Sequence, residues 1–481
     1  MGRTQRARSI LGASSAVLSM SLALSGTALA DPVPLSVVGS SGSGSGQLDA
    51  PRGMAIDSSG RLYVAEAVND RISVFNADGS FVHAFGWGVD TGTPQFEVCT
   101  ATSTCQAGIS GGNAGQFEFA AGLDLDNAGR LYVAEIPNRV SVFDVSAQPT
   151  FIHTFGWGVD TGTPQFEVCT ATSTCQNGIS GPAAGQLSAP WDVELDGAGS
   201  IYVSEGGNRR ISVFSAAGPS FVRAFGAGVA SGGTAFQVCT MTCQIGTNTT
   251  EAGGLNFPQE MSLDGSGNLY VIDSNQRVSR FNVAGPTFDR AYGLGVDNGL
   301  SFFQFCTTAS TCQAGATSAA AGAFQFPQGV AAGGGSVHVA DTDNRRVDVF
   351  NPAAGSFTHA YGWDVNPGGG SGLFEVCTTT STCQQGSAGG GIGQFAGNVG
   401  AVADCRGGVW VSEIGPNRIQ RFGEPGTPLP PCATSVPPAN NPPASTPTTP
   451  ASQPPAPSAP RKKCKKKKKG AAAARKCKRK K

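Results

Sequence analysis

Charged residues are scarce in this sequence, and lysine is absent from most of it. Only 14% of the 481 residues are charged, against 68 glycines and 30 prolines, which argues against long amphipathic helices. No heptad pattern is present, and no apolar run reaches the ~20 residues that a membrane-spanning helix requires. The 27 phenylalanines and many aliphatic residues can still form a large core, which excludes disorder over most of the chain. This composition favours one large architecture over the three or so domains that length alone suggests.

The formal net charge of zero hides a separation of the two signs. All 33 acidic residues lie between Asp31 and Pro460, where every basic residue is arginine. All the lysines lie in residues 461–481. An acidic body with a polycationic tail indicates two separate electrostatic roles.

Residues 1–30 have the features of a secretory signal peptide. Three arginines precede an apolar stretch from Ile10 to Leu24, and Ala28-Leu29-Ala30 then provides a small-residue cleavage site. Cleavage before Asp31 would leave no transmembrane helix and would deliver a secreted protein to an oxidising compartment. An uncleaved anchor is the alternative.

The C-terminal part divides into two segments. Residues 424–460 are rich in Pro, Ala, Ser and Thr, which is typical of an extended, disordered linker. Residues 461–481 form a disordered basic tail that could tether the protein to an anionic polymer or lipid of the cell envelope. The alternative is a solubilising tail that contacts its own acidic body. Export argues against a dedicated nucleic-acid partner.

A segment of about 70 residues recurs six times. Residues 85–106 and 155–176 are identical, which excludes a chance similarity. One column of the repeat holds Tyr63, Tyr132, Tyr202, Tyr270, His338 and Trp410. Within each copy apolar residues alternate with a period of two between turn signals such as Asp57-Ser-Ser-Gly60. Four short antiparallel strands per copy, packed radially, predict an all-β, six-bladed propeller.

The repeat also resembles a known family. Each copy carries most of the pattern Pro-x-Gly, aliphatic-x-aliphatic-Asp, Leu-Tyr-Val-Ala-Glu and Asn-x-Arg-Ile, which is similar to the NHL repeat of secreted bacterial NHL-repeat proteins. The resemblance covers roughly residues 35–423 and implies a six-bladed NHL propeller within a domain at 31–423. The last copy lacks a fourth strand, and the segment from Pro34 to Gly39 reads like one, so we expect it to close the ring.

An acidic residue at the end of each second strand precedes an arginine that opens the third strand. The pairs are Glu66/Arg71, Glu135/Arg139, Glu205/Arg210, Asp273/Arg277, Asp341/Arg346 and Glu413/Arg418. Sixfold occurrence favours a structural ion pair over a catalytic one.

Five insertions follow the fourth strands and lengthen the repeat. Each holds two close cysteines: Cys99/Cys105, Cys169/Cys175, Cys239/Cys243, Cys306/Cys312 and Cys377/Cys383. Disulfides are favoured over zinc because no histidine lies nearby and the chain is exported. A sixth bridge between Cys405 and Cys432 is plausible, and the state of Cys464 and Cys477 is open. Fourth-to-first loops share one end of a propeller, so we expect all five insertions on one face, where they bind a ligand. The alternative is that they only stiffen the protein.

The first strands supply candidate ligand-binding residues at the central channel. The predicted rim comprises Arg52, Trp191, Asp192, Gln259, Glu260 and Gln328. A second, overlapping set consists of four acidic residues that break the sixfold symmetry: Asp124, Asp192, Glu194 and Glu260. Clustered carboxylates suit Ca²⁺ or acid–base chemistry, although no spacing matches a calcium loop. No other cofactor is expected.

No convincing catalytic constellation is present. The amidating lyases that resemble NHL propellers hold zinc with channel histidines, whereas His83, His153 and His359 are predicted on outermost strands and His338 on a second strand. There is no Ser/His/Asp set, Walker loop or HExxH motif. The sequence favours a secreted binding or scaffold module for a protein or glycan at the cell envelope. The alternative is a Ca²⁺-dependent, lactonase-like hydrolase that uses the acidic channel residues.

Overall fold

The computed structural model describes residues 31–425 except 103, 172–173, 309–310 and 405–406. Every regular element in these ranges is a β-strand. No helix there is long and apolar enough to cross a membrane. The predicted signal peptide, the basic tail and nearly all of the Pro-rich linker lie outside the described residues.

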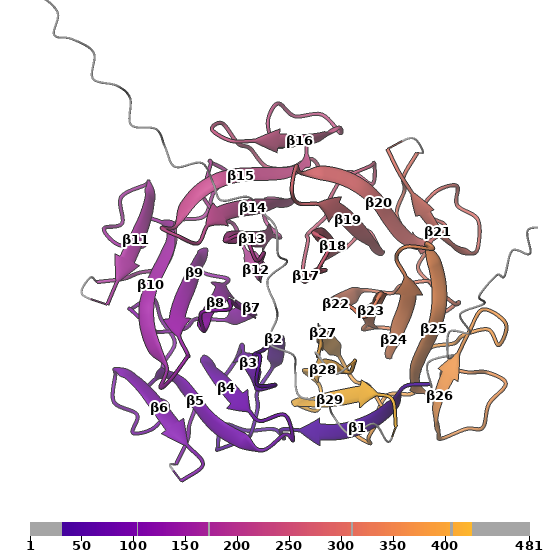
Figure 1. Cartoon of the computed structure of the whole chain (residues 1–481), viewed down its shortest axis with the longest axis horizontal. Coiled ribbons are helices and arrows are strands. Elements are labelled where there is room, and N and C mark those ends of the chain that lie inside the picture. The colour runs from indigo at the N-terminus through magenta and orange to yellow at the C-terminus, as the bar shows by residue number, and fades with distance from the viewer. Residues whose placement is uncertain (1–30, 103, 172–173, 309–310, 405–406, 426–481) are drawn as a thin grey trace, which may run out of the picture. The chain divides into compact units, whose positions relative to one another are not determined.

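Six antiparallel sheets surround a central channel (Figure 1). Blade one contains β2 (Pro51–Ile56), β3 (Leu62–Glu66), β4 (Arg71–Phe75), β5 (Phe81–Trp87) and β6 (Phe96–Thr100). Blade two contains β7 (Ala120–Leu125), β8 (Arg130–Glu135), β9 (Arg139–Asp144), β10 (Thr150–Trp157) and β11 (Phe166–Thr170). Blade three contains β12 (Pro190–Leu195), β13 (Ser200–Glu205), β14 (Arg210–Ser215), β15 (Ser220–Ala227) and β16 (Phe236–Cys239).

The remaining blades repeat this order. Blade four contains β17 (Met261–Leu263), β18 (Asn268–Asp273), β19 (Arg277–Asn282), β20 (Thr287–Leu294) and β21 (Phe303–Cys306). Blade five contains β22 (Pro327–Gly333), β23 (Ser336–Asp341), β24 (Arg346–Asn351), β25 (Ser356–Trp363) and β26 (Phe374–Cys377). Blade six contains β27 (Asn398–Ala403), β28 (Val409–Glu413), β29 (Arg418–Gly423) and β1 (Val33–Val38). The predicted six-bladed propeller is confirmed.

The turn between the first two strands of a blade shows how the sequence specifies these elements. Asp57 accepts hydrogen bonds from the backbone N–H groups of Ser59 and Arg61, both at 2.9 Å. Gly60 follows with a φ of 86°, a left-handed conformation that glycine adopts without a Cβ clash. The alternating residues of the flanking strands then pack between blades, as in the cluster of Leu62, Val64 and Trp410.

The N-terminal strand closes the ring as predicted. β1 pairs with β29 in an antiparallel register that runs from Val33 opposite Gly423 to Val38 opposite Ile419. Val38 is 3% exposed and packs in the cluster that joins blades six and one. The first and last strands of the propeller therefore share one sheet.

The structure corrects the expected number of strands and the position of the insertions. Blades one to five have five strands, because each insertion contributes an outer strand that pairs with the fourth, as β6 does with β5. These strands lie at the perimeter in Figure 1 rather than over one face. The physical reason is that an uncovered fourth strand would expose a row of backbone N–H and C=O groups. Blade six has no such insertion and keeps four strands.

The return segment of each insertion does reach the face where the second-to-third turns lie. Gly108 donates its N–H to the carbonyl of Asn69 at 2.7 Å, and Ile109 donates to Trp87 at 2.8 Å. Equivalent contacts join Gly178 to Pro137 and Gly246 to Asn208. We call this end of the propeller the insertion face.

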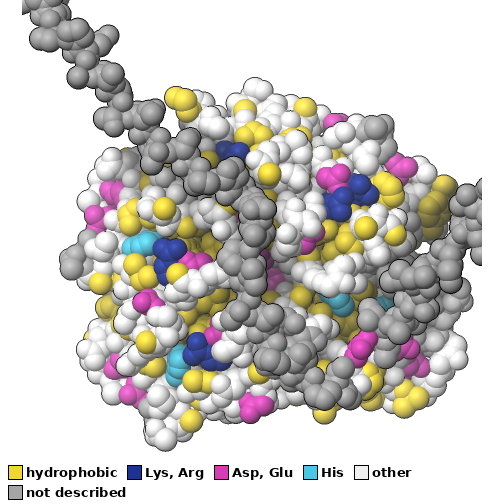
Figure 2. All heavy atoms as spheres, viewed as in Figure 1, with side chains coloured by type: hydrophobic (Ala, Val, Ile, Leu, Met, Phe, Trp, Pro, Cys, Tyr) yellow, Lys and Arg dark blue, Asp and Glu magenta, His cyan; other side chains and the backbone are white. Residues whose placement is uncertain are grey.

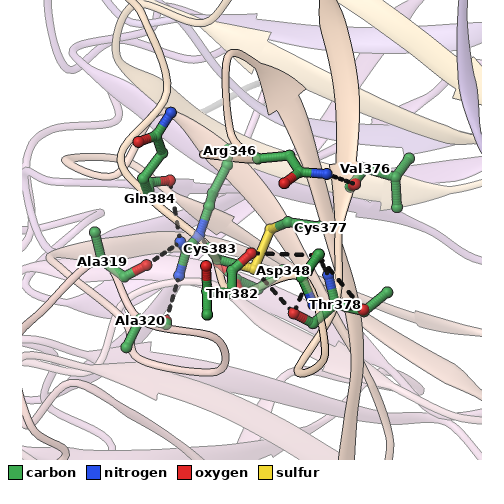
Figure 3. Close-up of a disulfide and its surroundings, with 12 residues drawn as sticks. Ala319, Ala320, Arg346, Asp348, Val376, Cys377, Thr378, Thr382, Cys383 and Gln384 are labelled. Carbon is green, nitrogen blue, oxygen red and sulfur yellow. Dashed lines mark hydrogen bonds and ion pairs between the residues drawn. A yellow bond between two sulfur atoms is a disulfide. The ribbon is translucent and has the colours of Figure 1, made fainter. Parts of the chain in front are cut away.

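The five predicted local disulfides are present, with Cα–Cα distances of 5.4–5.6 Å. They join Cys99 to Cys105, Cys169 to Cys175, Cys239 to Cys243, Cys306 to Cys312 and Cys377 to Cys383. Each bridge closes the hairpin that follows the fifth strand, and Figure 3 shows the one in blade five. Cys405, Cys432, Cys464 and Cys477 lie outside the described residues.

The position of these bridges shows which part of each blade they stabilise. The first cysteine of each pair belongs to the fifth strand, and the second lies in the segment that follows it. Four of these second cysteines are buried rather than presented to a ligand: Cys105, Cys175, Cys243 and Cys312. The physical reason is that each bridge packs with apolar residues of its own blade, as Cys99 and Cys105 do with Ala84 and Val89. The disulfides therefore stabilise the outer edge of the blades.

In the described part of the chain, the repeated arginine forms five of the six predicted ion pairs, all except Asp273/Arg277. Arg71 is fully buried and pairs with Glu66 at 2.7 Å. It also donates to the carbonyl of Gln47, which precedes its blade, at 2.8 Å and to that of Gln106, in the insertion, at 3.0 Å. In blade five, Arg346 donates to the carbonyls of Ala319, Ala320 and Gln384 (Figure 3), and its Nε pairs with Asp348 of its own strand at 2.9 Å. One guanidinium thus joins the turn, the incoming chain and the insertion.

Ring closure gives the first prediction. Deleting residues 31–39 should lower the Tm by roughly 5–10 °C. The closing strand contributes several kcal/mol to the free energy of unfolding, and each kcal/mol lost lowers the Tm of a large domain by ~2 °C. Differential scanning calorimetry measures this. Val38→Asp should act in the same direction, whereas Val37→Asp, at a side chain that is 36% exposed, is the matched control. An unchanged Tm for the deletion contradicts closure by β1.

Candidate functional site

Close contacts between the inner strands pinch the channel near the insertion face. A Cβ added to Gly53 would lie 2.6 Å from the carbonyl oxygen of Ala121, and one added to Gly400 would lie 2.5 Å from that of Arg52. Glycine is therefore required where neighbouring blades meet backbone to backbone. The space at this level is only about 10 Å³. The pinch divides the channel into a mouth and an inner cavity.

The inner cavity collects the four predicted acidic residues. Its volume is about 220 Å³, and its lining includes Asp124, Asp192, Glu194 and Glu260. Asp192 and Glu260 are buried, while Asp124 and Glu194 keep part of their surface open to the channel. The structure therefore brings together side chains from blades two to four, of which Asp192 and Glu194 lie on the same strand.

These carboxylates cap backbone N–H groups of other blades. Asp124 accepts from Leu195 at 2.9 Å, and Asp192 accepts from Met261 at 2.7 Å. Glu260 accepts from Val330 at 2.7 Å and from Ala401 at 3.1 Å. Inner strands have no sheet partner on the channel side. These hydrogen bonds therefore satisfy backbone N–H groups that would otherwise be buried without an acceptor.

Burial raises the pKa of all four acids. The pKa of Asp124 rises to about 7 and that of Asp192 to about 8, in both cases chiefly because desolvation disfavours the charged form. The pKa values of Glu194 and Glu260 also lie well above the usual range, because burial and the neighbouring carboxylates act together. Much of the cluster is neutral near pH 7.

This arrangement does not fit Ca²⁺. Among the described residues, no three acidic, histidine or cysteine side chains are placed to hold a metal ion. The carboxylates already accept hydrogen bonds from backbone N–H groups of neighbouring strands, so they do not converge on one position as the oxygen ligands of Ca²⁺ do. The four histidines lie on β5, β10, β23 and β25, and none of them lines the cavity.

The mouth above the pinch brings together two predicted rim residues. The Arg52 guanidinium carbon lies 5.2 Å from the ring centroid of Phe119 and 5.2 Å from that of Trp191. Trp191 also packs edge-on against Phe257, with centroids 5.7 Å apart. This contiguous cluster, which we call the aromatic mouth, spans blades one to four.

Three phenylalanines near the mouth have an unusual backbone conformation. Phe119, Phe257 and Phe326 have φ values of 53°, 52° and 53°, in the left-handed region that bulky residues rarely adopt. The same column holds Gly397 in blade six, where this conformation carries little strain. Phe257 is 38% exposed and Phe326 45% exposed, so burial of the rings does not account for their presence. Ala50 and Ala189, with φ values of 49° and 47°, occupy the same position in blades one and three, so the conformation belongs to the connection between blades.

Side chains from the preceding blade accept hydrogen bonds from several of the residues at this repeat position. Asp70 accepts the N–H of Phe119 at 3.1 Å, Asn138 that of Ala189 at 3.0 Å, and Gln276 that of Phe326 at 2.6 Å. These acceptors lie in second-to-third turns, so the strained residues are fixed from the insertion face.

The other predicted rim residues differ in burial and position. Gln259 is 3% exposed, and its buried Oε1 has no hydrogen-bond partner within the described part of the chain. Gln328 is half-buried. Asp192 and Glu260 line the pinch and the inner cavity. Sequence reasoning missed the three phenylalanines, although the glycine that replaces them in the sixth copy signals a positive φ.

Comparisons with known proteins add little to this geometry. No protein-family model matches the chain. Protein lin-41 of Caenorhabditis elegans is 41% identical over 49 residues, which are 10% of this chain and 4% of that protein. The chain therefore spans only a small part of this curated relative.

Solved propeller structures cover more of the chain at low identity. A streptogramin B lyase structure is 11% identical over 80% of this chain and 98% of its own, with a TM-score of 0.40. Virginiamycin B lyase from Staphylococcus aureus is 10% identical over 78% and 94%, with a TM-score of 0.38. The WD40 propeller domain of Doa1 is 8% identical over 82% and 97%, with a TM-score of 0.41. These likenesses are too distant to transfer an activity.

The acidic cavity predicts a stability that falls with increasing pH. The folded-state pKa values of Asp124 and Asp192 exceed the unfolded value of about 4, so their contribution is full below pH ~4 and is lost as the pH rises through about 7 and about 8. The Tm should therefore be lower at pH 9 than at pH 6. Asp124→Asn/Asp192→Asn should reduce this difference, and Asp160→Asn in an insertion should not. Equal differences in all three proteins would contradict the role given to the cavity.

The strained phenylalanines predict that one large truncation is nearly neutral. Phe326→Gly should change the free energy of unfolding by less than about 1 kcal/mol, because relief of the left-handed conformation offsets the lost packing and added chain entropy. Phe324→Ala, at a core side chain that is 1% exposed, should cost ~3–5 kcal/mol. Urea denaturation compares the two. Equal losses would mean that Phe326 is a structural residue.

Proposed function

We propose that this chain is a secreted, non-enzymatic binding module of the NHL type. It recognises a protein or glycan on the insertion face, with the aromatic mouth as the centre of the recognition surface. The proposal keeps the face expected from the sequence but moves the contact residues from the cysteine-bearing hairpins to the channel mouth.

The observation that carries this proposal is the set of aromatic residues that stay partly exposed near one end of the channel. Phe257 and Phe326 present apolar rings to solvent, and Trp191 packs against Phe257 with the Arg52 guanidinium next to its own ring. Trp, aromatic and Arg side chains dominate the energetics of binding surfaces. Their backbone is held by the rigid propeller, which lowers the entropy lost on binding.

The hydrolase alternative has weaker support. The carboxylates that would act in it cap backbone groups of neighbouring blades, and the pinch separates their cavity from the aromatic mouth. We therefore assign the acidic cavity to stability of the ring.

The proposed partners follow from the distribution of charge. Figure 2 shows one face, on which the basic side chains form small, separate groups beside acidic ones. A nucleic-acid surface has a continuous basic patch, which this face lacks. We propose no dedicated nucleic-acid partner, because the proposed export of the chain argues against one. The lysine-rich residues 461–481 are proposed to hold the protein at an anionic polymer or lipid of the cell envelope.

A binding assay tests the proposed recognition surface. The chain lacking residues 1–30 is applied to immobilised neutral and acidic glycans and to a peptide panel, and affinities are measured by biolayer interferometry. Trp191→Ala should lower the affinity for the ligand at least ten-fold, because the ring forms the centre of the mouth. Phe302→Ser is the matched control, since this insertion residue is 55% exposed but lies away from the mouth. Equal affinities for the wild type and Trp191→Ala would refute the assigned surface.

A further inference from the structure

We infer that Asp341 and Asp348 share one proton in the folded chain, and that loss of this proton releases the insertion of blade five, which carries Cys377 and Cys383. This behaviour is independent of the proposed binding function. Its origin is a single departure from the repeat, because a second carboxyl stands where other blades have a hydrogen-bond donor. Blade five is thereby made sensitive to pH.

The residue two positions after the repeated arginine usually donates a hydrogen bond to the acidic residue of its own blade. The donor is a serine hydroxyl or a glutamine amide in four blades: Ser73 donates to Glu66, Ser141 to Glu135, Ser212 to Glu205 and Gln420 to Glu413. Blade five has Asp348 at this position. A carboxylate has no hydrogen to donate, whereas a protonated carboxyl has one. Asp348 can therefore stand in for the missing donor only when the pair holds a proton.

The two carboxyls of blade five are buried beside one guanidinium. The side chains of Asp341, Arg346 and Asp348 are at most 1% exposed. Arg346 pairs with Asp348 at 2.9 Å and lies 3.6 Å from Asp341, and the two carboxyls lie within hydrogen-bonding reach of each other. Oδ1 of Asp348 has no N–H or O–H donor within the described residues. Two carboxylates against one guanidinium would leave a net negative charge buried, and a shared proton removes it.

Burial raises the pKa of both carboxyls. The pKa of Asp341 lies well above its usual range, because desolvation disfavours the charged form and the charge of Asp348 acts in the same direction. The pKa of Asp348 is also raised, chiefly by desolvation. Arg346 opposes both shifts, and in the described part of the chain it is the one other charged group that acts on the pair.

The remaining groups around the pair are uncharged or point elsewhere. The backbone N–H of Gln325 and the side-chain amide of Asn344 each donate to Asp341 at 2.7 Å. The histidines of β23 and β25 lie opposite Val349, so the alternation of the strands places them on the other face of the sheet. Asp343, in the adjacent turn, is exposed. The proton is therefore held by the two carboxyls themselves.

The pair is linked to the insertion through Arg346. The guanidinium donates to the carbonyl of Ala319, in the incoming chain, at 2.6 Å and to that of Gln384, in the insertion, at 3.3 Å (Figure 3). Gln384 directly follows Cys383 of the disulfide. These segments cover the pair, so water reaches the two carboxyls when the insertion opens.

Opening of the insertion therefore releases the proton. In contact with water both carboxyls would return to a pKa of about 4, below their folded-state values. Closure is then fully favoured below pH ~4 and weakens as the pH rises through the folded pKa of the pair. Each unit of pKa shift changes the closing equilibrium by about ten-fold. Rising pH should open blade five before the blades that have serine at this position.

Hydrogen exchange followed by mass spectrometry tests this on the chain lacking residues 1–30. Opening of residues 377–390, in blade five, is compared with opening of residues 169–182, in blade two, after correction for the intrinsic effect of pH on exchange. The ratio of the two should rise about ten-fold or more between pH 5 and pH 9, because Ser141 of blade two has no proton to lose. A ratio that stays constant would overturn the inference.

Two substitutions of Asp348 assign the effect to the pair. Asp348→Ser installs the residue of blades one to four, and Asp348→Asn keeps the shape of the side chain and donates an amide hydrogen at every pH. Both should abolish the rise in the ratio. Asp343→Asn is the matched control, since it removes an exposed carboxyl of the same blade and should leave the rise unchanged. A rise that persists in both Asp348 variants, or that disappears in Asp343→Asn, would contradict a proton shared by Asp341 and Asp348.

Discussion

Each blade of this propeller has two sheet edges, and the need to satisfy their backbone groups accounts for much of the structure. On the outside, the insertions of blades one to five supply a fifth strand and a disulfide-closed hairpin. On the inside, glycines bring neighbouring strands into contact, and carboxylates accept the N–H groups that remain. Both devices follow from the cost of burying an unpaired backbone group. The cysteines and the channel acids, which look like functional residues in the sequence, are explained by this requirement.

The acids illustrate how position decides the role of a residue. Carboxylates gathered in a cavity are usual candidates for metal binding or catalysis. Here they lie at the inner edge of the strands, so that a neutral carboxyl can accept a backbone hydrogen bond without the desolvation penalty of a charge. The symmetry of the ring is broken because blades two to four use Asp or Glu where other blades use glycine or small residues. A departure from repeat symmetry is therefore insufficient evidence of a ligand site.

Much of the fold could be predicted because the six copies of the repeat can be aligned with one another. The column of Tyr63, the turn at Asp57 and the missing fourth strand of the last copy determined the blade number and the closure by β1. The fifth strands were missed because Phe96–Thr100 is short and lies within an insertion rich in Thr and Gly. Arg52 and Trp191 could be assigned to one rim, since residues in one column of a propeller converge on the channel. Phe119, Phe257 and Phe326 were missed because a positive φ depends on how each blade joins the next.

Closure by β1 also determines how the propeller would bear load. The chain leaves the propeller after β29, which lies between β28 and β1 and pairs with both. Tension applied from the C-terminal side therefore acts on an interior strand. The hydrogen bonds of β29 to β28 and to β1 must both break before the strand is released. A strand at the edge would instead be peeled away one hydrogen bond at a time. A protein held by its C-terminal end would in this way keep the proposed binding face folded under flow.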